Sequence, residues 1–210
     1  MWKNHKGSII LTTIITLLPI LAGLLLWDQL PDQVAIHFNA AGEPDNWAGR
    51  GFAVLGMPAI IAALHLVCIF ITSADPKHKN ITGKMLWLTL WVCPFISWLC
   101  AAMVLGHTLG FVSNIEMCVC VSMGILFMVL GNYLPKCTPN YTIGIKLPWT
   151  LNDEGNWNYT HRIGGFSFTI GGALTLLTSF FGSVWLILTV LIAMVVVPLV
   201  ASYLYYRKHL

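Results

Sequence analysis

Long apolar segments alternate with short polar ones along this chain of 210 residues. A helix needs about 20 mostly apolar residues to cross the hydrocarbon core of a bilayer, and six segments of the chain have that character. We predict membrane spans at residues 8–27, 52–73, 85–109, 115–134, 163–181 and 184–205. The pattern therefore predicts an all-α, polytopic membrane protein with six transmembrane helices.

The longest polar interruption runs from Gly131 to Gly165, between the fourth and fifth predicted spans. Three prolines in its first half exclude a continuous helix there, because proline lacks the amide donor and clashes with the preceding turn. Thr150 and Asp153 have the spacing of a capping box, which predicts a short helix over residues 151–162. Its aromatic residues favour the membrane–water interface. We therefore expect a structured loop with a short interfacial helix before helix five.

Basic residues fall almost entirely on one side of this arrangement. Only Arg50, among 11 Lys and Arg residues, lies on the other side. Loops rich in Lys and Arg stay in the cytoplasm, so we expect both termini and the loop over residues 135–162 to be cytoplasmic. The loop over residues 28–51 then faces outward. The residues on the cytoplasmic side are Lys3, Lys6, Lys77, Lys79, Lys84, Lys136, Lys146, Arg162, Arg207 and Lys208.

The composition agrees with a membrane protein and excludes several function classes. The chain is 57% hydrophobic and 9% charged, whereas soluble domains carry about 25% charged residues. The net charge is only +3, and no basic run resembles a nucleic-acid patch, so direct nucleic-acid binding is not expected. The predicted helix interiors carry no Asp, Glu, Lys or Arg, which weighs against an ion-coupled transporter.

Small residues mark two of the predicted helices. Gly124 and Gly131 on the fourth helix are seven residues apart, and paired glycines on the fifth helix have the same spacing. Such faces let another helix backbone come close. Together with His65, a lone histidine deep in the second span, they leave open a permease for a small solute or a lipid-like molecule. The simpler interpretation is helix packing.

The outward loop over residues 28–51 is rich in proline and glycine, so we expect a turn-rich cap. In this interpretation Phe38 and Trp47 dip into the membrane interface. His37 lies near several carboxylates, which leaves open a metal-dependent membrane hydrolase, but no ligand spacing is diagnostic. We favour the cap, and we expect neither a metal nor a cofactor.

Two sets of residues carry a resemblance to a known family, and together they cover nearly the whole chain. The first set is similar to an uncharacterised amino-terminal membrane domain, and the second resembles the signature of the SdpI family, at whose front that domain is found. Only Leu147 departs modestly from the signature. The first set is Leu30–Pro31, Ile36–Asn39, Gly42, Pro44–Asp45 and Trp47; the second is Gly131–Pro135, Asn140–Tyr141, Gly144–Lys146, Pro148–Thr150, Trp157, Thr160–Arg162 and Gly164–Gly165.

The resemblance implies a function that composition does not show. The family is named for a bacterial membrane protein that protects a toxin producer from its own secreted peptide. That protein also holds a transcriptional repressor at the membrane when toxin is present. We therefore expect a multi-pass, non-enzymatic immunity and signalling protein of the bacterial cytoplasmic membrane, with lipids, a peptide toxin outside and a small repressor inside as partners. The amino-terminal domain would cover residues 1–75 and the SdpI-like domain residues 76–210.

The two polar loops then supply the candidate sites. A receptor needs two distinct surfaces that share one two-state element, and side chains such as Trp, Tyr and Arg dominate protein interfaces. For outward recognition we predict His37, Phe38, Asn39, Asp45 and Trp47. For cytoplasmic docking we predict Asn140, Tyr141, Lys146, Trp149, His161 and Arg162.

Overall fold

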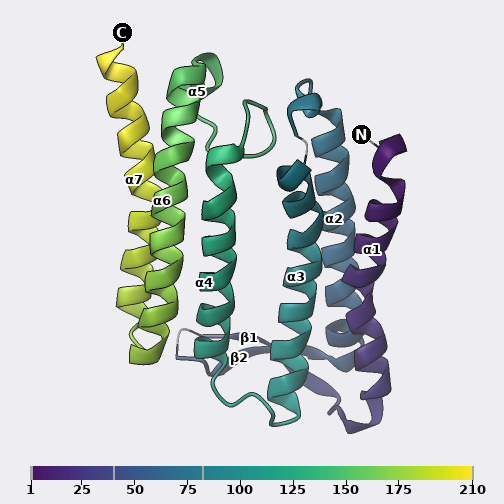
Figure 1. Ribbon diagram of the computed structural model, residues 1–210. Coiled ribbons are helices and arrows are strands. Elements are labelled where there is room, and N and C mark those ends of the chain that lie inside the picture. Colours follow the sequence, from purple (N-terminus) through teal and green to yellow (C-terminus); the bar gives the residue numbers. More distant parts are fainter. Residues whose placement is uncertain (1, 40, 82, 210) are drawn as a thin grey trace. The chain divides into compact units, whose positions relative to one another are not determined.

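The computed structural model describes residues 2–39, 41–81 and 83–209, and within this part six helices are long and apolar enough to cross a membrane (Figure 1). The predicted all-α fold with six spans is therefore confirmed. The orientation of the termini stays a prediction. The helices are α1 (Trp2–Leu25), α2 (Met57–Ala74), α3 (Gly83–Thr108), α4 (Ile115–Tyr133), the short α5 (Pro148–Asn152), α6 (Glu154–Thr178) and α7 (Val184–Lys208).

The chain divides into two compact units. Unit 1 comprises Met1–Phe70 and Leu88–Val119, and unit 2 comprises Ile71–Trp87 and Cys120–Leu210. Helices α2 and α3 therefore contribute to both units, because their ends at residues 71–87 belong with the second. The proposed domain boundary at residue 75 stays a prediction.

Proline inside α1 explains one set of contacts in unit 1. Pro19 has no amide hydrogen, so the Ile15 carbonyl loses its partner within the helix. An unsatisfied backbone group in lipid costs several kcal/mol. The indole nitrogen of Trp98 donates to this carbonyl oxygen at 3.1 Å, and the Ser97 hydroxyl donates to the Thr16 carbonyl oxygen at 2.7 Å. Side chains of α3 therefore donate hydrogen bonds to carbonyl oxygens of α1 where the proline interrupts that helix.

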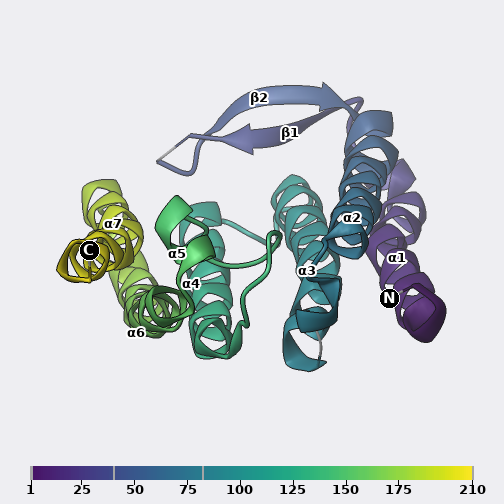
Figure 2. The ribbon, with the colours of Figure 1, turned by 90° about the horizontal axis from the view of Figure 1, so that it is seen from above.

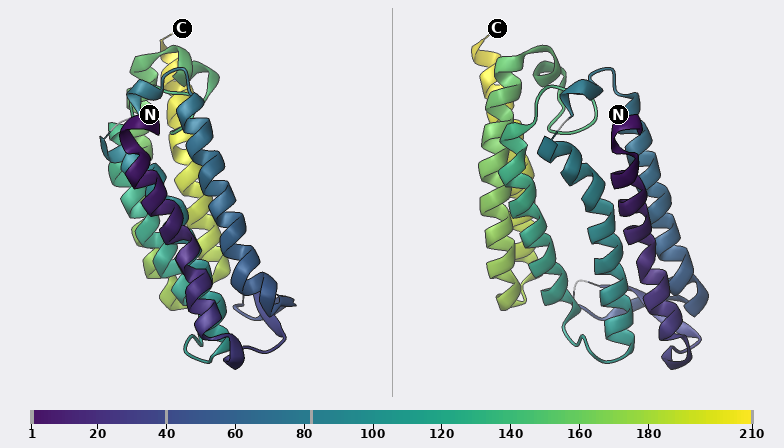
Figure 3. Two further views of the ribbon diagram at one scale, coloured as in Figure 1. Left: turned by 90° about the vertical axis from the view of Figure 1, so that its right-hand side faces the viewer. Right: turned by 45° about the vertical axis from the view of Figure 1, so that its right-hand side comes forward.

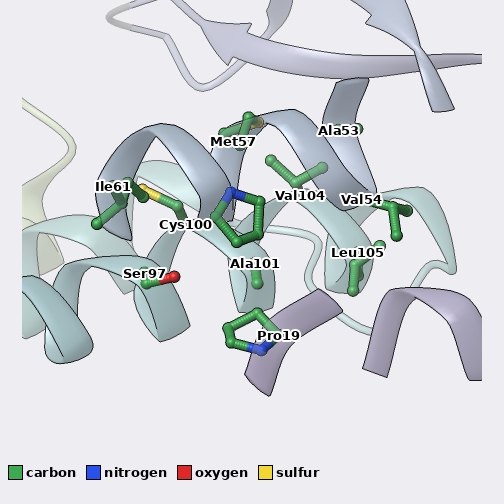
Figure 4. Close-up of a pocket in the computed structure, with 11 residues that line it drawn as sticks. Pro19, Ala53, Val54, Met57, Ile61, Ser97, Cys100, Ala101, Val104 and Leu105 are labelled. Atoms are coloured by element: carbon green, nitrogen blue, oxygen red, sulfur yellow. The ribbon is translucent and has the colours of Figure 1, made fainter. Parts of the chain in front are cut away.

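A small void lies beside this proline. Its volume is about 10 Å³, close to the space that one water molecule needs. Pro19, Val54, Ser97 and Leu105 are among the residues around it (Figure 4). The void is therefore a packing gap between helices of unit 1 and too small for a substrate.

The loop over residues 28–51 contains a β-hairpin, which the sequence pattern did not predict. Strand β1 (Gln33–Phe38) pairs antiparallel with β2 (Pro44–Gly49). In unit 1 the hairpin lies at the end opposite the amino terminus (Figure 3) and beside the start of α2 (Figure 2). Val34 is buried and packs with Ala53 and Val104. The prediction of a turn-rich cap therefore omitted two short strands, which the prolines and glycines of this segment concealed.

Glycine positions set how closely α4 and α6 pack in unit 2. A Cβ at Gly124 would lie 2.7 Å from the Gly172 carbonyl oxygen, and a Cβ at Gly131 would lie 2.7 Å from the Gly165 carbonyl oxygen. Real Cβ atoms essentially never come that close. The prediction that these glycines let another backbone approach is therefore confirmed, and the partner helices are α4 and α6.

Helix α6 begins earlier than predicted. The sequence pattern predicted a separate helix at residues 151–162, whereas α5 ends at Asn152 and α6 runs unbroken from Glu154. Asp153 is extended and caps α6, accepting a hydrogen bond from the Gly155 amide at 2.8 Å. Thr150 instead belongs to α5, where its hydroxyl accepts from the Leu147 amide. The polar start of α6 continues into the span because its neighbour α7 satisfies its buried polar groups.

A proline also interrupts the backbone hydrogen bonds of α7, as Pro19 does in α1. Pro198 lacks an amide hydrogen, so the Met194 carbonyl four residues earlier is free of its usual helical partner. The Ser167 hydroxyl of α6 donates to this carbonyl oxygen at 2.8 Å. The two helices form the expected antiparallel hairpin, joined by a short turn at residues 179–183.

We expect the Ser167 hydrogen bond to matter only while Pro198 is present. Ser167→Ala should lower the unfolding free energy by about 1 kcal/mol, the usual size of a side-chain hydrogen bond in a membrane. In the Pro198→Ala background the same change should cost less, because the alanine backbone supplies an amide to the Met194 carbonyl. Denaturing-detergent titration of the four proteins measures the coupling. Equal costs in both backgrounds would contradict this explanation.

Candidate functional site

The polar loop between α4 and α5 in unit 2 is an ordered structure held by three buried polar side chains. We call residues 137–147 the anchored loop. Its anchors are Asp75 at the end of α2, Asn140 within the loop and His161 on α6, with exposures of 4%, 1% and 1%. Buried polar groups are stable only when hydrogen-bonded, so the partners of each anchor show how the loop keeps its shape.

Asp75 joins α2 to the anchored loop. One carboxylate oxygen accepts from the Lys77 amide at 2.7 Å. The other accepts from the Tyr141 amide at 2.8 Å and the Thr142 hydroxyl at 2.6 Å. Burial raises the pKa of Asp75, but these hydrogen bonds outweigh it and hold the pKa below its ordinary value. Asp75 therefore acts as a charged clamp on the loop.

The clamp makes the loop sensitive to acid. Because the pKa of Asp75 is lower in the folded state than in the unfolded state, its stabilisation is present above the unfolded pKa near 4 and is lost as the pH falls through the folded pKa. Hydrogen exchange at the Tyr141 amide should accelerate, relative to intrinsic exchange, as the pH drops below about 4. In Asp75→Asn the Tyr141 amide should exchange rapidly at neutral pH, because the free energy that protects it falls by about 2 kcal/mol. Protection equal to wild type in this variant would contradict the clamp.

Asn140 closes the loop on itself. Its side-chain oxygen accepts from the amides of Thr142 at 2.9 Å and Ile143 at 2.6 Å. Its amide group donates to the Thr138 carbonyl oxygen at 2.8 Å and to the Cys137 sulfur at 3.4 Å. Every hydrogen-bonding group of this buried carboxamide is therefore used within a few residues, which makes Asn140 a structural anchor.

Cys137, at the start of the loop, and Trp157 of α6 belong to one buried apolar cluster. Both are buried and pack with Met85, and the Trp157 indole donates to the Cys137 carbonyl oxygen at 2.7 Å. Burial raises the pKa of the Cys137 thiol to about 11. At neutral pH this cysteine is therefore a thiol that packs like a small apolar side chain.

His161 connects the loop to α6. Its Nε2 accepts a hydrogen bond from the Ile145 amide at 3.0 Å, and its Nδ1 donates to the Trp157 carbonyl oxygen at 2.8 Å. An amide can only donate and a carbonyl can only accept, so the ring is neutral with its proton on Nδ1. The ring also stacks on Trp157, with centroids 4.1 Å apart. His161 is therefore positioned to hold the loop and not to exchange protons with solvent.

A buried polar cluster joins α5, α6 and α7. The Trp149 indole donates to the Ser202 hydroxyl oxygen at 2.9 Å. Ser202 and Thr160 both donate to the side-chain oxygen of Asn156, at 2.9 and 2.8 Å, and the amide of Asn156 donates to the Ser202 carbonyl oxygen at 3.1 Å. This mutual satisfaction explains how three polar residues are buried between membrane helices.

The six predicted docking residues therefore fall into two groups. Asn140 and His161 are buried anchors, and Trp149 is half-buried against α7. The other three, Tyr141, Lys146 and Arg162, are exposed.

The exposed group is partly held in place. The Lys146 ammonium donates to the carbonyl oxygens of Tyr141 at 3.2 Å and Thr142 at 2.8 Å, and the Lys77 ammonium lies 5.0 Å from the Tyr141 ring centre. A docking partner would therefore meet an organised surface.

Sequence reasoning missed Asp75, Asn156 and Ser202. One feature of the sequence could have indicated Asp75, because it is the only carboxylate in the short basic loop between the second and third spans. No feature of the sequence indicates Asn156 or Ser202. A serine in an apolar helix and an asparagine in a polar segment are ordinary residues, and their pairing depends on how α6 and α7 align.

The five residues predicted for outward recognition lie in or next to the hairpin of β1 and β2, in different environments. The His37 Nδ1 pairs with the Asp45 carboxylate across the strands, and both side chains are exposed. The Asn39 side-chain oxygen accepts from the Glu43 amide at 3.0 Å and closes the turn.

The two aromatic residues of this set also differ. Phe38 packs edge-on against His107 of α3, with ring centroids 4.8 Å apart, whereas Trp47 is exposed. His37, Asp45 and Trp47 are therefore available on the surface, while Phe38 and Asn39 support the hairpin.

Comparison with known proteins finds family matches for two parts of the chain. Residues 136–202 match the SdpI/YfhL protein family, and residues 14–62 match a domain of unknown function called DUF1648. We call residues 136–202, which match this family, the SdpI-family region. The chain is also 23% identical over 202 residues to the Immunity protein SdpI of Bacillus subtilis strain 168, an alignment that covers 95% of this chain and 96% of the relative. No solved structure matches the chain.

The SdpI-family region coincides with the structure built around the anchored loop. It contains Asn140, His161 and the buried cluster that ends at Ser202, which is the last matched residue. Asp75 lies outside it. The resemblance noted in the sequence is therefore confirmed, and the chain is a multi-pass membrane protein similar to the Immunity protein SdpI.

Proposed function

We propose that this chain is an immunity protein of the bacterial cytoplasmic membrane, and that it protects the cell from a secreted antimicrobial peptide toxin. The observation that carries the proposal is the similarity to the Immunity protein SdpI, which extends over 95% of the chain. Six apolar helices supply the membrane location. In this proposal the hairpin with His37, Asp45 and Trp47 faces outward, where a toxin would arrive.

A second role, as a receptor that sequesters a transcriptional repressor, is favoured by the surface of the anchored loop. Tyr141 and Lys146 of the loop and Arg162 of α6 are exposed, and Tyr and Arg are enriched in interface hot spots. The loop below them is held by Asp75 and Asn140. A fixed polar surface costs less ordering on binding than a flexible one, which suits a docking site.

The two alternatives from the sequence have less support. Among the described residues, no group of three His, Cys, Asp or Glu side chains could hold a metal ion, so the hydrolase has no such site there. The glycines that suggested a permease pack α4 against α6. His65 forms a 3.0 Å hydrogen bond to Thr12 between α2 and α1, which is the packing role of a polar residue in a membrane.

Protection is tested by expression in a toxin-sensitive bacterial host. Cells that carry this chain should survive higher concentrations of a family toxin than cells with the empty vector. A Gly144→Ala variant, which should not hold the anchored loop, serves as a folding-defective control, and membrane immunoblots record the amount of each protein. If the wild-type chain is abundant in the membrane and protects against no family toxin, the immunity proposal is wrong.

The docking role is tested in the same host with a repressor-controlled reporter. Lys146→Ala and Arg162→Ala should abolish the reporter response while resistance and protein level stay near wild type. Lys79→Ala, which removes an exposed positive charge elsewhere in unit 2, should leave the response unchanged. If the first two variants only lower the amount of folded protein, the loop is a scaffold and the docking proposal is wrong.

A further inference from the structure

A pocket lies where α5, the start of α6 and the end of α7 meet, all within unit 2. Its volume is about 450 Å³. The residues around it differ from the apolar groups that line the membrane helices, because four are aromatic or polar and one is a carboxylate. They are Pro148, Trp149, Asn152, Asp153, Tyr206 and His209.

The aromatic side of this pocket is fixed in position. The Trp149 ring stacks on Tyr206, with centroids 5.4 Å apart and planes 19° apart, and Tyr203 meets it edge-on at 5.7 Å. Its indole nitrogen is held by Ser202 of the buried cluster. The Trp149 ring is therefore set by contacts to α7 before any ligand arrives.

The negative side of the pocket is Asp153. One of its oxygens accepts from the Gly155 amide at 2.8 Å, but a carboxylate has two oxygens and about four acceptor sites. Asp153 is exposed and so keeps capacity for another donor. Among the described residues that line the pocket, none is Lys or Arg, so no permanently charged side chain there pairs with the carboxylate.

We propose that this pocket binds a basic side chain of an inward protein partner, with the guanidinium of arginine as the preferred group. Cations are attracted to aromatic rings, and a planar guanidinium both stacks on rings and pairs with a carboxylate. The pocket offers these two partners together. The inference rests on the proposed function, because it names the kind of side chain that the inward partner presents.

A lipid headgroup fits this chemistry less well. Phosphatidylethanolamine carries an ammonium group, but its phosphate would enter beside the exposed carboxylate of Asp153. Like charges at close range disfavour such a complex. An arginine on a protein brings no anion of its own, so charge complementarity favours the protein ligand.

The test uses purified full-length protein and two small probes, N-acetyl-arginine amide and its neutral counterpart N-acetyl-citrulline amide. Calorimetric titration should show binding of the arginine probe only. Asp153→Asn should weaken it about fivefold, the range for an exposed charge pair. Asparagine is as good an N-cap as aspartate, so this variant keeps the start of α6. Glu154→Gln removes a neighbouring charge outside the pocket lining and should bind as wild type.

Three results would overturn the inference. The first is equal binding of both probes, and the second is binding of the arginine probe by Asp153→Asn as tightly as by wild type. The third is displacement of the arginine probe when phosphatidylethanolamine replaces phosphatidylglycerol in nanodiscs, which would assign the pocket to lipid. No toxin or repressor is present in these titrations. A failure of the immunity proposal therefore appears only in the survival assay, and a failure of the pocket appears only here.

Discussion

Gly144→Ala is expected to destabilise the anchored loop by about 3 kcal/mol. Gly144 has φ +115, a conformation in which an L side chain is strained by about 1–3 kcal/mol. A Cβ here would also press on Nε2 of His161, the atom that accepts from the Ile145 amide. The added methyl group would therefore break the hydrogen bond that joins the loop to α6.

Hydrogen exchange of the loop amides and detergent-denaturation curves would measure the loss. Gly182→Ala is the matched control, because Gly182 also has a positive φ of 58 but its Cβ would meet nothing within 4 Å. It should cost only about 1 kcal/mol, from backbone strain alone. If both variants lose the same stability, the contact with His161 contributes nothing and the anchoring role of His161 is wrong.

Gly131→Leu should separate α4 from α6 and lower the unfolding free energy by about 3 kcal/mol or more. A Cβ at this position would lie 2.6 Å from the Thr169 amide nitrogen and 2.7 Å from the Gly165 carbonyl oxygen. Backbone atoms cannot rotate away as a side-chain end can, so the helices themselves must move. Overpacking a tight interface costs about 1–3 kcal/mol and occasionally more, and these close backbone contacts place Gly131 at the upper end.

Cysteine cross-linking between α4 and α6, together with denaturation curves, would detect the separation. Gly7→Leu is the control, because Gly7 is also in a helix but a Cβ there would meet nothing within 4 Å. It should stay within about 0.5 kcal/mol of wild type. Normal cross-linking and stability in Gly131→Leu would mean that α4 and α6 do not rely on the glycine contact.

Much of the fold follows from sequence because the bilayer restricts the choices. Backbone groups in lipid must be satisfied within a helix or a closed barrel, so long apolar segments determine the six spans before any tertiary contact is considered. The spacing of Gly124 and Gly131 likewise indicated a closely packed face. The signature residues lie close together in the chain, so the sequence could point to the loop between Gly131 and Gly165 as a candidate site.

Tertiary structure alone decided what those signature residues do. Asn140 and His161 look like surface polar residues in sequence, yet they are buried because the loop folds back on α6. Asp75 reaches Tyr141 across 66 positions of the chain, and no local pattern encodes that distance.

Helix α6 shows the same limit at a helix boundary. Its polar start resembled a separate interfacial helix, but Ser202 of α7 forms hydrogen bonds with the buried side chain of Asn156 and lets the helix continue. Sequence determines which segments enter the membrane, because that depends on each segment's own hydrophobicity. The partner of each polar group depends on which helices come together, and this is why only the folded chain separates the anchors from the exposed residues.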